Sequence, residues 1–188
     1  ALAAFDRTIQ LDPRNAEAHH HRGISLVALR QFEGAIAAFD AALALRPEYP
    51  EVLNDKGKAL LASGGVEDAI AGFDAALAVH PGFADAMYSK GRALFESGSF
   101  DEAETVLRRT LDIQPDCSPA LYMLGRAVFD LGRYEDAIRF YNRVLEINPK
   151  SVRAHHFKGV AYAALEQHQD AIRSFDRALE LNPAYAPA

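Results

Sequence analysis

The chain has 188 residues, of which 49% are hydrophobic, and its formal net charge at pH 7 is −6. No apolar run is long enough to cross a bilayer, and no basic segment leads into an apolar one as in a signal peptide. The acidic balance and the lack of a basic cluster argue against a nucleic-acid-binding surface. The single cysteine, Cys117, excludes an internal disulfide and a cysteine-based zinc site.

The main feature of the chain is a repeat of 34 residues, which the prolines mark most plainly. They stand at Pro13, Pro47, Pro81, Pro115, Pro149 and Pro183, and glycines keep the same spacing at Gly23, Gly57, Gly91, Gly125 and Gly159. A repeat of about 20 to 50 residues is typical of a solenoid, in which each unit packs against its neighbours. The sequence therefore predicts one continuous array over residues 1–188.

The predicted elements follow one another in a fixed order. Residues 1–15 carry apolar side chains at spacings of three and four, which predicts the second helix of a truncated repeat. Five full repeats follow, at residues 16–49, 50–83, 84–117, 118–151 and 152–185. Each is predicted to form a helix, a short turn and a second helix; in the first repeat these helices are residues 16–29 and about 33–45. Because residue 1 is already in phase and no Met precedes it, we expect the sequence to be a fragment of a longer protein.

Several positions indicate how the helices begin and pack. Asn15, Ser118 and Ser151 are predicted N-caps. A glycine inside a helix costs about 1 kcal/mol relative to alanine. The glycine kept at place eight, counted from the first residue of each repeat, therefore predicts a close approach of the two helices. Large side chains at place twenty-four are predicted to fill the core, and the aromatic ones are Phe39, Phe73, Tyr141 and Phe175.

Taken together, these residues resemble the tetratricopeptide repeat family. In the first repeat the motif residues are Gly23, Leu26, Ala35, Phe39, Ala42 and Pro47, and the later repeats keep most of them. The third repeat departs furthest, with Leu107 in place of the aromatic residue and Thr110 in place of the second alanine. The resemblance implies an all-α fold, a right-handed superhelix of antiparallel helix pairs whose first helices line a concave groove. It also implies a scaffold or adaptor, not an enzyme, that binds an extended peptide or partner segment.

The groove residues are predicted from the geometry of the first helices, on which places five, nine and twelve lie on one stripe. Three consecutive repeats carry a cation at place nine, and two of them carry aromatic residues at places five and twelve. The predicted peptide-binding residues are Asn54, Lys58, Tyr88, Arg92, Phe95, Tyr122, Arg126 and Phe129, together with His20 and His156. Arginine and aromatic residues dominate binding hot spots, so the predicted partner is a protein or peptide that is acidic or has a free carboxylate.

Other interpretations stay open. Arg92 with Glu96, and Arg126 with Asp130, are spaced i,i+4, so each pair could form a solvated ion pair with no role in binding. The uncapped apolar ends could also stack head to tail in a structural self-assembly. As a third alternative, the array could be a regulatory appendage of an enzyme that lies outside this sequence.

No residue pattern predicts catalysis, a cofactor or a metal ion. Consecutive helical residues point about 100° apart, so His19, His20 and His21 do not converge on one ion. The chain has no phosphate-binding or dinucleotide-binding loop, and no base is paired with Cys117 within its repeat. Neither a nucleic acid nor a membrane is indicated as a partner. The lone cysteine suits a reducing compartment, and we expect a cytoplasmic protein.

Overall fold

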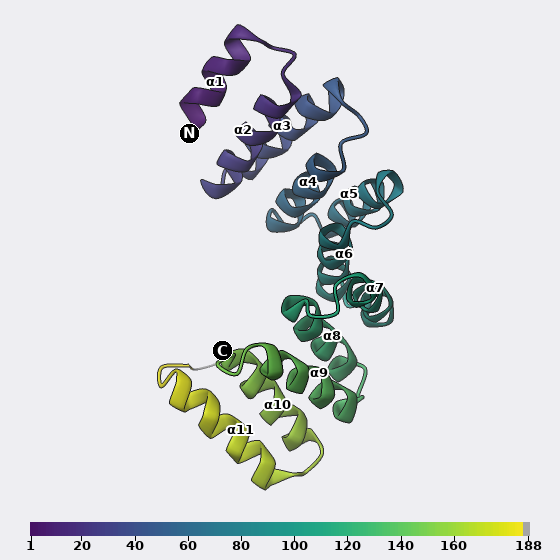
Figure 1. Cartoon of the computed structure of the whole chain (residues 1–188), viewed down its shortest axis with the longest axis vertical. Coiled ribbons are helices and arrows are strands. Elements are labelled where there is room, and N and C mark those ends of the chain that lie inside the picture. Colours follow the sequence, from purple (N-terminus) through teal and green to yellow (C-terminus); the bar gives the residue numbers. More distant parts are fainter. Residues whose placement is uncertain (186–188) are drawn as a thin grey trace. The chain divides into compact units, whose positions relative to one another are not determined.

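The computed structural model of the chain is all-α and describes residues 1–185 (Figure 1). Its helices are α1 (Leu2–Leu11), α2 (Ala16–Ala28), α3 (Phe32–Leu45), α4 (Pro50–Ala62), α5 (Val66–Val79), α6 (Ala84–Glu96), α7 (Phe100–Ile113), α8 (Ser118–Asp130), α9 (Tyr134–Ile147), α10 (Val152–Ala164) and α11 (His168–Leu181). The bounds of α2 and α3 differ from the predicted ones by a single residue, and the later pairs recur at the 34-residue spacing. The predicted helix–turn–helix repeats are therefore confirmed.

The chain divides into two compact units, Ala1–Ser97 and Gly98–Ala188. The first unit contains α1 to α6, and the second contains α7 to α11. Within the first unit, α2 packs against α3, and α4 packs against α3 and α5. Within the second unit, α8 packs against α7 and α9, and α10 packs against α9 and α11. Within each unit, helices that are consecutive in the sequence contact one another, as expected of a repeat protein.

In the core of each full repeat but the third, an aromatic ring from the second helix lies against the glycine of the first. The rings of Phe39 and Tyr141 are completely buried, as predicted. A Cβ atom added to Gly23 would lie 2.4 Å from Cε1 of Phe39, and one added to Gly125 would lie 2.6 Å from Cε1 of Tyr141. Carbon atoms in contact lie about 3.5–4.0 Å apart. The recurring glycine therefore makes room for the ring.

Two of the three predicted N-caps are confirmed. The backbone N–H of Ala18 donates to Oδ1 of Asn15 at 2.9 Å, and that of Ala154 donates to Oγ of Ser151 at 3.3 Å. The prediction for Ser118 is wrong by one residue, because α8 begins at Ser118 and Cys117 is its N-cap. The proline that follows fits inside the first helical turn, where its missing N–H would have no helical partner, so the helix begins one residue earlier than expected.

Ion pairs join consecutive repeats in the first unit. Three times, a basic residue at place seven of a first helix pairs with an aspartate at place twenty-five of the preceding repeat. The pairs are Arg22 with Asp6 at 2.8 Å, Lys56 with Asp40 at 2.6 Å, and Lys90 with Asp74 at 2.6 Å. The junctions within the second unit cannot form this ion pair. Leu124 stands in place of the cation in the fourth repeat, and Asn142 stands in place of the aspartate that would pair with the fifth repeat.

Candidate functional site

The predicted binding residues lie on the first helices of both units. Six of them belong to α2, α4 and α6 of the first unit, and four belong to α8 and α10 of the second. Consecutive first helices contact one another within a unit, α2 with α4, α4 with α6, and α8 with α10. We call the side of these helices that carries places five, nine and twelve the first-helix face of each unit. His20, Asn54 and Leu61, which stand at these places in the first unit, are buried.

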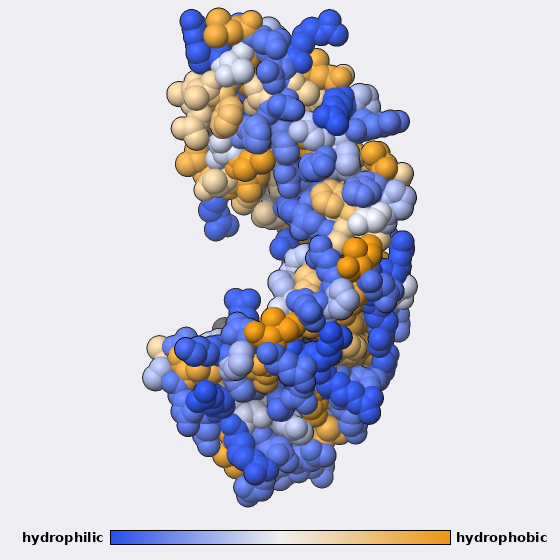
Figure 2. Space-filling model, viewed as in Figure 1, coloured by the Kyte–Doolittle hydropathy of each residue, from blue (hydrophilic) through white to orange (hydrophobic). Residues whose placement is uncertain are grey.

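The visible surface carries no dominant apolar region that would explain binding by itself. On the side shown in Figure 2, polar residues in blue and apolar residues in orange are interspersed over both units. Binding by such a surface depends on individual side chains and their partners. The contacts that each predicted residue makes therefore determine whether it can take part in binding.

In the first unit, Lys58 lies between two carboxylates. Its Nζ atom is 2.6 Å from Oδ2 of Asp85 on α6 and 3.5 Å from Oδ1 of Asp55 on its own helix. Asn54, which is almost completely buried, donates from Nδ2 to the same oxygen of Asp85 at 2.8 Å. An acidic ligand at this point would compete with two carboxylates that already hold the ammonium group.

His20 belongs to the same polar network. Its Nε2 atom is 2.8 Å from Oδ2 of Asp55, so this aspartate connects α4 to both the histidine of α2 and the lysine beside it. A cavity of about 140 Å³ lies next to the network, lined by Ile24, Val27, Phe39, Asp55 and Lys58. The cavity has an apolar wall and a polar edge, which suits a single small side chain of a ligand.

The other predicted residues of the first unit lie on α6. Nε of Arg92 is 3.4 Å from Oε1 of Glu96, so the intrahelical ion pair that the sequence offered as an alternative does form. Tyr88 and Phe95 are half-buried. Two half-buried aromatic residues thus stand on the same helix as a guanidinium group that is already paired within it.

In the second unit, Arg126 is held against aromatic rings. Its guanidinium carbon lies 4.2 Å from the ring centroid of Phe157, which is a cation–π contact. The ring of Tyr122 meets that of Phe157 edge to face, with centroids 5.8 Å apart. Burial raises the pKa of the Tyr122 hydroxyl, while a hydrogen bond to Arg126 opposes the rise. These contacts hold the guanidinium group of Arg126 in one orientation.

Beneath this cluster the hydroxyl of Tyr141 is buried, and it has no hydrogen-bond partner among residues 1–185. Burial raises the pKa of this hydroxyl far above its ordinary value. The phenol therefore stays neutral, and the ring of Tyr141 packs in the core as a large side chain.

His156 lies at one end of the second unit's first-helix face, beside a cavity of about 210 Å³. The cavity is lined by His156, Phe175, Ala178, Leu179 and Tyr185. The imidazole is 5.6 Å from the ring of Phe175 and 5.5 Å from that of Tyr185, measured between centroids. Burial, and then the charge of Arg126, lower the pKa of His156 below its ordinary value, which favours the neutral ring.

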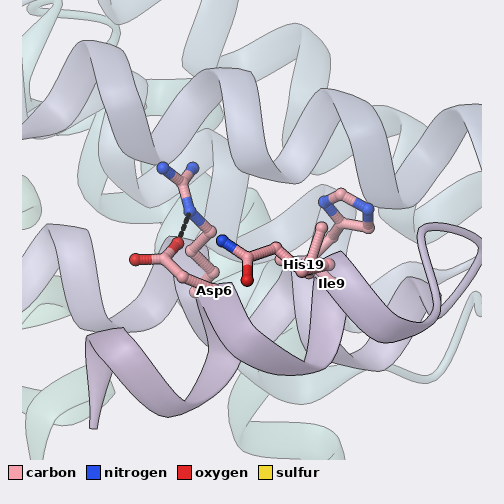
Figure 3. A pocket seen from close by; sticks show the side chains of 5 residues that line it. Asp6, Ile9 and His19 are labelled. Carbon is pink, nitrogen blue, oxygen red and sulfur yellow. Dashed lines mark hydrogen bonds and ion pairs between the residues drawn. The ribbon is translucent and has the colours of Figure 1, made fainter.

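A larger opening, of about 490 Å³, lies between α1 and α2 (Figure 3). Its polar lining residues have partners within the chain. Arg22 pairs with Asp6 at 2.8 Å (Figure 3), and His19 bonds the carbonyl of Pro13 at 3.0 Å. Within residues 1–185, no group of three His, Cys, Asp or Glu side chains could hold a metal ion. His19 bonds the carbonyl of Pro13 and His20 bonds Asp55, while the ring of His21 stacks on that of His20 with centroids 5.5 Å apart.

Sequence reasoning missed the partners that decide how the predicted residues behave. It did not assign roles to Asp55 and Asp85, which bind Lys58, or to Phe157, which supports Arg126. A signal for two of these residues exists at place six of the repeats, where Asp55 stands in the second repeat and Phe157 in the fifth. A polar or aromatic residue at place six determines which ion pair or ring contact is offered to a cation nearby.

Comparison with known proteins assigns the fold to a family. Four models of the tetratricopeptide repeat match the chain, at residues 16–49, 54–118, 94–161 and 152–185. No curated protein sequence matches it. Among the described helices, none is long and apolar enough to span a bilayer.

Solved structures of the same architecture agree with these matches. The chain is similar to a crystal structure of MamA, with 28% identity and a TM-score of 0.80, covering 86% of this chain and 94% of that one. It is similar to PilW, described as a widely conserved type IV pilus biogenesis factor, with 26% identity, a TM-score of 0.88, and coverage of 98% and 85%. YrrB, described as a TPR protein with an unusual peptide-binding site, shares the fold at 23% identity, with a TM-score of 0.80 and coverage of 98% and 95%. The chain belongs to the tetratricopeptide repeat family.

Proposed function

We propose that the chain is a protein-interaction scaffold whose first-helix faces bind an extended segment of a partner protein. The observation that carries the proposal is the fixed guanidinium group of Arg126, which lies 4.2 Å over the ring of Phe157 beside Tyr122. A guanidinium group held in one orientation loses little conformational entropy on binding. The guanidinium plane of Arg126 has the donor geometry that suits a carboxylate or a backbone carbonyl of a ligand.

The predicted residues take different roles in this proposal. In the second unit Arg126 binds the acidic or carbonyl group, while Tyr122, Phe129 and His156 contact the neighbouring side chains of the ligand. In the first unit the same roles fall to Arg92, Tyr88 and Phe95. Asn54, Lys58 and His20 contribute through their network with Asp55 and Asp85, whose carboxylates compete with an acidic ligand for the lysine.

The proposed ligand is an acidic segment, or one with a free carboxylate. Arginine bonds a carboxylate through two parallel N–H groups, which gives both strength and orientation. The fold is compatible with such a role, because YrrB has the same fold and is described as having a peptide-binding site. The specific preference for acidic ligands rests on the chemistry of the two arginines.

A peptide-display selection on the 188-residue chain, followed by fluorescence anisotropy on the selected peptides, tests this function. We expect Arg126→Ala to weaken binding at least about tenfold, as is usual for a central hot-spot residue. Arg143→Ala is the matched control, since that arginine belongs to the second helix α9 and bonds the carbonyl of Pro115. Equal affinities for the Arg126→Ala and wild-type chains, with unchanged helical circular dichroism, would refute the proposal.

A further inference from the structure

The first unit has a groove of about 360 Å³ between α4 and α5, which we call the α4–α5 groove. Most of its lining is apolar or small, with Leu53 and Leu60 from α4, and Ala71, Gly72 and Ala75 from α5. Leu53 and Leu60 are only half-buried, so each keeps apolar surface in contact with solvent. None of the residues that line this groove belongs to the first-helix face.

The fourth repeat fills the equivalent groove with its own side chains. Two repeats after Leu53 and Leu60 the chain has Leu121 and Val128, and both of these are completely buried. Phe140 stands where the second repeat has Gly72, and it packs against the core cluster that contains Leu121. An aromatic ring in the fourth repeat thus covers apolar surface that the glycine of the second repeat leaves uncovered.

The fourth repeat also supplies a base for the acid beside this groove. Asp136 is the counterpart of Asp68, which lines the α4–α5 groove. Its carboxylate pairs with Arg133 at 2.9 Å and with Arg139 at 3.1 Å. The filled groove therefore combines an aromatic ring with guanidinium groups that pair with a carboxylate.

The second repeat has the acid without the base. Gly65 and Ala71 stand in place of the two arginines, and within residues 1–185 no cation pairs with Asp68, which is exposed. The other charged residue that lines the groove, Lys56, is held by Asp40 at 2.6 Å. Uncovered apolar side chains beside an unpaired carboxylate suit a ligand that is both apolar and basic.

We propose that the α4–α5 groove binds a segment of a partner protein that carries an arginine directly before an aromatic residue. The aromatic ring covers Leu53 and Leu60, and the guanidinium group pairs with Asp68. The order of the two residues is that of Arg139 and Phe140, which fill the equivalent groove in the fourth repeat. Charge complementarity selects this occupant, because the unpaired carboxylate would repel an acidic segment. The groove and the first-helix face share no residue, so this site does not depend on the proposed function above.

A short peptide is the probe for this site. Acetyl-Arg-Phe-amide is titrated into the isotope-labelled 188-residue chain, and amide chemical shifts are followed by NMR. We expect saturable shifts at Ala71, Gly72 and Ala75. Acetyl-Arg-Ala-amide should bind at least about tenfold more weakly, because it lacks the apolar surface of the ring. Acetyl-Glu-Phe-amide should bind about threefold more weakly, because it replaces an exposed ion pair by a repulsion.

Two variants of the chain test the groove residues, each with a matched control. Ala75→Arg should weaken binding of acetyl-Arg-Phe-amide at least about tenfold, because a long side chain fills the groove. Its control is Ala78→Arg, the same change at an exposed residue of α5 outside the groove. Asp68→Asn should weaken binding about threefold, as expected for an exposed ion pair. Its control is Glu67→Gln, which removes a charge one residue earlier, also outside the groove.

Weaker binding by Ala75→Arg and Asp68→Asn, but not by their controls, supports the proposal. The absence of saturable shifts, or equal affinities of the Ala75→Arg and wild-type chains, would overturn it. Shifts confined to α8 and α10 would assign the probe to the first-helix face of the second unit instead. A molecular mass that rises with concentration in light scattering, and no longer does so in Ala75→Arg, would make a second copy of the chain the occupant.

Discussion

At the scale of single residues, the repeated glycine is explained by the ring opposite it. We expect Gly23→Ala to lower the free energy of unfolding by about 1–3 kcal/mol, because a Cβ atom 2.4 Å from Phe39 forces the ring or the helix to move. Gly34→Ala is the matched variant in the same repeat, where the added Cβ would lie 3.5 Å from Leu26 in ordinary contact. It should stabilise by up to about 1 kcal/mol through helix propensity. Urea unfolding followed by circular dichroism measures both, and equal effects would contradict this explanation.

The histidines of α10 give a second prediction at the residue scale. Burial lowers the pKa of both His155 and His156 below the ordinary value of about 6.5. Between the lowered pKa and about 6.5, the unfolded chain binds more protons than the folded one, so the free energy of unfolding falls as pH decreases through this window. Above about pH 7 these two groups make no pH-dependent contribution.

Replacing both histidines tests this linkage. The double variant His155→Gln, His156→Gln should have a flatter dependence of unfolding free energy on pH between about 7 and 5. The measurement is a series of urea titrations at fixed ionic strength. Carboxylates that titrate at lower pH are common to both proteins and cancel in the comparison. An unchanged slope would show that the histidines are not protonated more readily in the unfolded chain.

At the scale of elements, ion pairs between helices supplement the apolar contacts of the first unit. Lys90 on α6 bonds Asp74 on α5 at 2.6 Å, with only 20% of the lysine side chain exposed. A double-mutant cycle with Lys90→Met and Asp74→Asn should give a coupling of about 0.2–1 kcal/mol, which decreases with added salt. The control pair is Arg173 with Asp170 on α11, whose side chains are 74% and 44% exposed and should couple less. A coupling no larger than this control would mean that the interhelical pair does not stabilise the junction.

The helices themselves were predictable because their signals are local and recur. Apolar spacing, breakers and prolines placed α2 and α3 to within one residue. The exception was the start of α8, where Ser118 was expected to cap the helix but is its first residue. The N-cap position and the first turn of a helix favour similar side chains, so the sequence alone does not distinguish the two positions.

At the scale of the whole molecule, the two units present different chemistry on their first-helix faces. The first unit balances His20 and Lys58 against Asp55 and Asp85, so its charges are largely satisfied internally. The second unit stacks Arg126 on Phe157 beside a cavity lined by His156. The two units therefore hold their cations by different contacts, although both units repeat the same helix pair.

The sequence by itself determined the family, the 34-residue repeat and the helix pairs. These features follow from the spacing of residues along the chain, and the same spacing recurs in every repeat. Only the tertiary structure decided how the face is charged, because the deciding contacts join residues on different helices. Asp55 and His20 are separated by 35 positions, and Asp85 and Lys58 by 27. Whether a cation is held by a carboxylate or stacked on a ring depends on which neighbour its side chain reaches, and that is set by helix packing.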